Sequence, residues 1–104
     1  MHHTIKITCS DDGKFDYEPH QVRLQLRLHE KYGDTVEWVC NEEKFALNFG
    51  WNTPFKKGRY QGSRTESIKP KYHHNVRHDR YKYFVCVLKD GHLWTDDPNV
   101  IIEP

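Results

Sequence analysis

The chain has 104 residues, enough for a single domain with one hydrophobic core. Apolar residues make up 36% of it and charged residues 30%, and fourteen aromatic and eighteen β-branched residues accompany a single alanine. This composition excludes a helical bundle, a coiled coil and a membrane span, and it favours a small β domain. Sixteen basic and fifteen acidic residues give a net charge of +1, so the overall charge indicates no class of partner.

Alternation of apolar and polar residues predicts strands over the first half of the chain. Residues 5–9 alternate, and Asp11-Asp12-Gly13 predicts the turn that follows. Residues 22–29 alternate without a break, so one face of this strand is expected in the core and the other in water. Residues 35–40 and 45–49 repeat the pattern. The expected inward side chains are Ile5, Ile7, Cys9, Val22, Leu24, Leu26, Leu28, Val36, Trp38, Cys40, Phe45, Leu47 and Phe49.

The second half of the chain begins with a long irregular excursion over residues 52–78, with a short strand expected around 65–69. Residues 81–88 are apolar on both faces and predict a central strand. A hairpin turn at Asp90-Gly91 and a closing strand over 99–102 complete the pattern. We therefore predict an all-β fold, a small antiparallel β-sandwich of about seven strands that occupies residues 1–104 as one domain.

The order of these motifs resembles the cupredoxin family of β-sandwiches. The resemblance rests on residues 17–19 (YEP), 22–24 (VRL), 33–38 (GDTVEW), 45–49 (FALNF) and 81–86 (YKYFVC). It implies a cupredoxin-like scaffold over most of the chain, with the excursion as its least constrained part.

The copper ligands that the resemblance would imply are mostly missing. A blue-copper centre needs two histidines, a cysteine thiolate and usually a weak axial methionine. The first histidine position holds Phe45, and the only methionine is Met1. Cys86 and His92 stand in the order of the family's cysteine and second histidine, but the predicted turn falls between them. We expect no copper cofactor, and Cys86 with His92 remains an alternative metal or electron-transfer pair.

A second candidate metal site is the histidine cluster of the excursion, His73, His74 and His78, with Asp79 as a further ligand. Imidazoles bind copper or zinc, whereas a solvated basic loop is the competing interpretation. His2 and His3 could bind Cu(II) or Ni(II) together with a free amino terminus, but a tag remnant or a disordered end is the simpler expectation. The three cysteines have no CxxC spacing, and we expect buried reduced thiols in a soluble, cytoplasmic protein.

The basic–aromatic segment, residues 55–82, is the candidate partner-binding site. Residues 56–82 hold nine Lys and Arg against two acidic residues. Basic and aromatic side chains together suit an acidic protein surface or a larger complex, and single-stranded nucleic acid is an alternative. The expected contact residues are Lys56, Lys57, Arg59, Tyr60, Arg64, Lys69, Lys71, Tyr72, Arg77 and Arg80.

The sequence contains no motif typical of an enzyme: no phosphate-binding glycine loop, nucleophile elbow or HExxH is present. The resulting hypothesis is a non-catalytic binding or assembly module, with no membrane contact expected and no indication of its oligomeric state.

Overall fold

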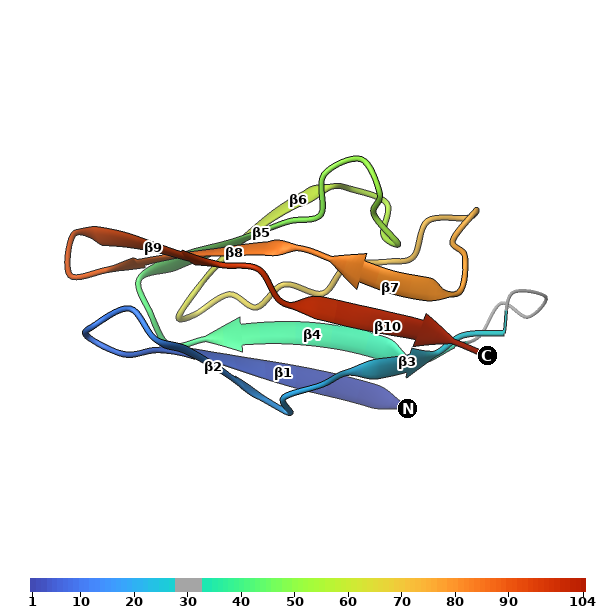
Figure 1. Cartoon of the computed structure of the whole chain (residues 1–104), viewed down its shortest axis with the longest axis horizontal. Coiled ribbons are helices and arrows are strands. Elements are labelled where there is room, and N and C mark those ends of the chain that lie inside the picture. Colours follow the sequence, from blue (N-terminus) through green and yellow to red (C-terminus); the bar gives the residue numbers. More distant parts are fainter. Residues whose placement is uncertain (28–32) are drawn as a thin grey trace.

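The computed structural model describes residues 1–27 and 33–104, and within them it is built from strands and connecting loops (Figure 1). No helix long and apolar enough to cross a bilayer occurs among these residues. The ten strands are β1 (His2–Cys9), β2 (Phe15–Glu18), β3 (Arg23–Gln25), β4 (Thr35–Cys40), β5 (Lys44–Asn48), β6 (Arg59–Ser63), β7 (Asp79–Lys82), β8 (Phe84–Lys89), β9 (His92–Asp96) and β10 (Asn99–Glu103).

The strands form three sheets around one core. Their orders are β2-β1-β4, β3-β10-β7 and β6-β5-β8-β9. Only Tyr83 separates β7 from β8, and only Asp97 and Pro98 separate β9 from β10, so the second and third sheets share two continuous stretches of chain. Figure 1 shows the β2-β1-β4 sheet lying below the β6-β5-β8-β9 sheet. The predicted all-β fold is confirmed.

The expectation of a purely antiparallel arrangement is wrong for two strand pairs. Strand β1 runs parallel to β4, from His2 opposite Thr35 to Ile7 opposite Cys40. Strand β3 is likewise parallel to β10. The alternation that predicted the strands has the same period in both kinds of ladder, so it carries no information about direction.

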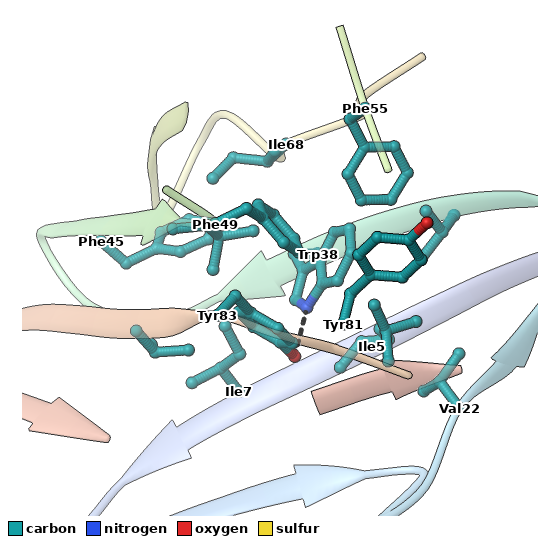
Figure 2. Packing of buried hydrophobic residues seen from close by; sticks show 14 of the residues in the cluster. Ile5, Ile7, Val22, Trp38, Phe45, Phe49, Phe55, Ile68, Tyr81 and Tyr83 are labelled. Carbon is teal, nitrogen blue, oxygen red and sulfur yellow. Dashed lines mark hydrogen bonds between the residues drawn. The ribbon is translucent and has the colours of Figure 1, made fainter. Parts of the chain in front are cut away.

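Trp38 lies at the centre of the core and is fully buried. Its Nε1–H donates a hydrogen bond to the Tyr83 hydroxyl at 3.0 Å (Figure 2). The rings of Phe49, Phe55 and Tyr83 lie at centroid distances of 6.0, 5.9 and 5.5 Å from its ring. Trp38 on β4 is thus packed by the residue after β5, the residue between β7 and β8 and the irregular segment, and the only polar atom of its side chain is hydrogen-bonded.

The expected inward residues are confirmed wherever the structure describes them. All twelve that the structure describes are buried; Leu28, like His29, lies outside the described residues. Both predicted turns are also confirmed by left-handed backbone: Gly13 has φ +83°, and Asp90 and Gly91 have φ 50° and 78°. Cys9 and Cys40 are buried free thiols, and burial raises the pKa of each.

Several boundaries differ from the sequence prediction. The ten strands exceed the seven expected because β2 and β6 were not predicted and because the strand predicted over 81–88 is divided at Tyr83 into β7 and β8; β9 is the far arm of the predicted hairpin. The strand predicted over 22–29 contains only Arg23–Gln25 within the described residues. Residues 65–69 make isolated bridges, Ser63 with Glu66 and Ile68 with Trp38, and no strand. Strand β8 is central, as expected, but its outer face is open: Phe84 is 61% exposed.

Candidate partner-binding surface

The irregular segment 52–78 is fastened to the core at several places. Phe55 is fully buried and forms a bridge with Tyr72, and the two rings stack at 5.6 Å. Ile68 is buried and exchanges two backbone hydrogen bonds with Trp38, at 2.9 and 3.0 Å. The His73 N–H donates to the Pro54 carbonyl at 2.9 Å. The segment therefore has a defined shape and can present side chains in fixed positions.

The bridge between Phe55 and Tyr72 brings the backbones of two lysines together. The Lys56 N–H donates to the Lys71 carbonyl at 2.9 Å, next to the Phe55–Tyr72 bridge. Phe55 is buried and Tyr72 packs on the core, whereas Lys56 and Lys71, their neighbours in the chain, are exposed. Two exposed positive charges carried by neighbouring stretches of backbone form a surface that attracts an anion.

Most cations of the basic–aromatic segment are free of carboxylates. Lys69 lies 3.6 Å from Glu37, and Lys82 lies 3.7 Å from Asp97. The other seven make no ion pair within 4.0 Å with any carboxylate of the described residues. These seven are Lys56, Lys57, Arg59, Arg64, Lys71, Arg77 and Arg80, and all are exposed.

The predicted contact residues divide into a cluster and scattered members. Lys56, Lys57 and Lys71 come together at the bridged part of the segment. Arg59 lies on β6 beside the fully exposed Trp51, with which it lines one hollow. Arg64 follows β6 in the chain, and Arg80 lies on β7 in another sheet.

The tyrosines of the segment face inward. Tyr60 and Tyr72 both pack against the core cluster. The Tyr60 hydroxyl accepts a hydrogen bond from the Lys57 N–H at 3.0 Å, and the Tyr72 hydroxyl donates to the Asp34 carbonyl. Burial raises the pKa of both hydroxyls. Neither ring is therefore free to stack on a planar ligand.

The histidines of the segment are not gathered on one point. His73 and His74 stack with their ring centroids 4.7 Å apart, whereas the His78 Nε2 lies 2.6 Å from the Leu26 carbonyl. Within residues 1–27 and 33–104, no group of three or more His, Cys, Asp or Glu side chains is placed to hold a metal ion.

Cys86 and His92 lie apart on the β8–β9 hairpin. Cys86 pairs with Thr95, and His92 pairs with Lys89. Counting along β8 places Cys86 on the outer face, next to Phe84 and Leu88, and the row of Lys89 and His92 on the other face. The expectation that Cys86 is buried is wrong, since it is only half-buried. His2 and His3, expected as a disordered end, form the start of β1 opposite Thr35 and Val36.

Two acidic residues, Glu37 on β4 and Asp34 just before it, contact the basic–aromatic segment. Glu37 accepts a hydrogen bond from the Ser67 hydroxyl at 2.6 Å, and that bond, with a second to His2, lowers the pKa of the Glu37 carboxyl. Burial would raise the pKa of Asp34, but hydrogen bonds from the Gln25 N–H, His3 and the terminal amine outweigh it and lower the pKa.

These two carboxylates make the stability depend on acid pH. Because both folded-state pKa values are lowered, their contribution is complete above the ordinary values of about 4 and is lost as the pH falls through the folded-state values. Urea unfolding at pH 6, 5, 4 and 3 measures this loss. Glu37→Gln is expected to lower the free energy of unfolding at pH 6 by about 1 kcal/mol and to flatten the pH dependence.

Glu43→Gln is the control for this series, since Glu43 is exposed and has no hydrogen bond or ion pair with the described residues. Its unfolding curve should follow that of the wild type at every pH. A Glu37→Gln variant that keeps the full wild-type pH dependence would contradict the role of this carboxylate.

Sequence reasoning missed four residues that the structure makes conspicuous. Trp51 is fully exposed, Phe84 and Leu93 are 61% and 67% exposed, and Lys44 on β5 lines a hollow together with Leu93. For Trp51 the sequence held a signal: it follows Gly50 just after the predicted strand 45–49, outside the alternation that marks buried positions. For Phe84 the signal was the second apolar face of residues 81–88, which was interpreted as buried.

Comparison with known proteins finds no match for this chain among family models, curated proteins or solved structures.

Proposed function

We propose that this chain is a non-catalytic binding or assembly module that docks on an acidic protein surface through the basic–aromatic segment. One observation carries the proposal: a backbone hydrogen bond joins Lys56 to Lys71, and both side chains are exposed without a described carboxylate within 4.0 Å. The stacked rings of Phe55 and Tyr72 hold the two residues in this position, so the binding surface is ordered by folding before a partner arrives.

The inward tyrosines favour an acidic protein over single-stranded nucleic acid. Proteins that bind single strands without sequence preference stack bases on accessible aromatic rings. In the basic–aromatic segment Phe55 and Tyr81 are buried, and Tyr60 and Tyr72 pack on the core. What the segment offers to a partner is positive charge, which suits a carboxylate-rich surface.

We also propose that the scaffold is a cupredoxin-like β-sandwich without a blue-copper centre. In support, the motifs that carry the resemblance fall on β2, β3, β4, β5 and the β7–β8 stretch, around a single core. The position expected for the first histidine holds the buried Phe45, and Cys86 and His92 lie on opposite faces of their hairpin. The donor set therefore does not fit a type 1 copper ion.

Binding of a simple polyanion tests the proposed function. Fluorescein-labelled polyglutamate is titrated with the protein, in parallel with a single-stranded oligonucleotide of equal charge and with polylysine as a control. We expect polyglutamate to bind, about tenfold more weakly when salt rises from 50 to 300 mM because exposed charges are then screened. No polyglutamate binding would contradict the proposal, and tighter oligonucleotide binding would favour the nucleic-acid alternative.

A further inference from the structure

The outer face of the β6-β5-β8-β9 sheet carries an apolar stripe that residues 1–27 and 33–104 leave open. Strand β8 turns Val85 and Val87 into the core, both fully buried, and turns Phe84, Cys86 and Leu88 outward. Leu88 pairs with Leu93 on β9, and Phe84 and Leu93 are 61% and 67% exposed. Apolar residues on both faces are typical of a strand covered on both sides, whereas the part of the chain that the structure describes covers only one face of β8.

The stripe is hollowed along the strands. A groove of about 290 Å³ is lined by Ala46, Cys86, Leu88, Leu93 and Lys44, among others. A hollow of about 220 Å³ adjoins Phe84 and Thr95, and one of about 350 Å³ lies between Trp51 and Arg59. Spaces of this size are at or below the small end of the usual range for ligand pockets, roughly 300–1,000 Å³. They suit single large side chains of a docked segment.

The charged side chains beside the stripe indicate the charge of a partner that could bind there. Lys44 and Arg59 flank the groove and the Trp51 hollow, and neither has a carboxylate within 4.0 Å among the described residues. The acidic residues at the β9 side are already engaged: the Tyr17 hydroxyl donates to Asp96 at 2.8 Å, and Lys82 lies 3.7 Å from Asp97. Lys44 and Arg59 therefore favour an occupant that brings carboxylates to this side of the stripe.

We propose that this stripe is the docking site for an acidic segment of a partner protein that carries large apolar side chains. Carboxylates of the segment would pair with Lys44 and Arg59, while its apolar side chains fill the groove beside Leu88 and Leu93. The proposal rests on the proposed function and names the partner's chemistry: acidic and apolar residues in one stretch. Arg59 belongs to both surfaces, so the stripe and the basic–aromatic segment join at β6.

Two peptides test this inference: an octapeptide of alternating glutamate and leucine, and one of alternating glutamate and serine. Leucine burial in the groove should make the first bind about tenfold more tightly than the second. Ala46→Leu fills the groove floor from the outside and should remove this difference. Thr4→Leu adds the same bulk at an exposed position of β1, in another sheet, and should leave the difference intact.

The outcomes separate the two proposals. Equal binding of both peptides, or a leucine advantage that survives Ala46→Leu, overturns the docking site and leaves the proposed function standing. Failure of both peptides to bind overturns both. Sedimentation of the protein alone provides a further test: a dimer that Phe84→Ser dissociates would show that a second copy covers the stripe, and would overturn the inference.

Discussion

Replacing Trp38 with alanine is expected to lower the free energy of unfolding by about 4 kcal/mol. The change removes the side chain on which Phe49, Phe55 and Tyr83 pack, and leaves a cavity in the middle of the core. Domains of this size have only about 5–15 kcal/mol of stability in total, so the variant should unfold at much lower urea concentration. Far-UV circular dichroism follows the transition without relying on tryptophan fluorescence.

Trp51→Ala is the matched control, because the same side chain is deleted where it is fully exposed. Its effect should stay within about 0.5 kcal/mol. Tyr83→Phe should fall between the two, at about 1–2 kcal/mol, since it leaves the buried Trp38 Nε1–H without its acceptor. Similar losses for Trp38→Ala and Trp51→Ala would contradict the placement of Trp38 at the centre of the core.

Reversing the charges of Lys56 and Lys71 in the double variant Lys56→Glu, Lys71→Glu is expected to weaken polyglutamate binding by roughly thirtyfold. Each reversal removes an attraction and adds a repulsion at an exposed site, together about 2 kcal/mol, and about 1.4 kcal/mol corresponds to a factor of ten. The fold should persist, because both side chains are exposed and the Phe55–Tyr72 pair beneath them is untouched. Fluorescence anisotropy at low salt measures the affinity.

Lys6→Glu with Lys14→Glu changes the net charge by the same amount on the far side of the core, on β1 and in the turn after it. This control should weaken binding only slightly, through the overall charge. Equal losses in the two double variants would show that the protein attracts polyanions through net charge alone, and would remove the case for a site at Lys56 and Lys71.

The alternation of apolar and polar residues was sufficient to predict the core residues of the strands, but not Phe55 and Ile68, which reach the core from the irregular segment. Trp38 and Val36 on β4, or Phe45 and Leu47 on β5, are buried as the pattern requires, because a strand with one covered face has no other arrangement. Strand β6 could not be predicted in this way. Its residues Arg59–Ser63 show no alternation, and they form a strand because β5 offers them a ladder. Gly62 belongs to that fit, since a Cβ there would lie 2.5 Å from the Phe45 ring.

The candidate site was predictable in composition but not in geometry. The excess of Lys and Arg in residues 56–82 was visible in the sequence. The closeness of the Lys56 and Lys71 backbones, however, depends on Phe55 and Tyr72 both packing on the core. No local pattern links positions so far apart in an aperiodic stretch. For Phe84 the local pattern was misleading. Its neighbours are apolar on both faces, as in a strand covered on both sides, and only the structure shows that the described residues leave the Phe84 face open.

The most direct measurement of where an acidic partner binds is an amide chemical-shift map of the ¹⁵N-labelled protein titrated with polyglutamate. We predict that the largest shifts lie at Lys56, Lys57 and Lys71, with Arg59 and Trp51 next, and that they vanish in the Lys56→Glu, Lys71→Glu variant. Shifts centred on the β1–β2 turn, or spread evenly over the surface, would contradict a binding site on the basic–aromatic segment.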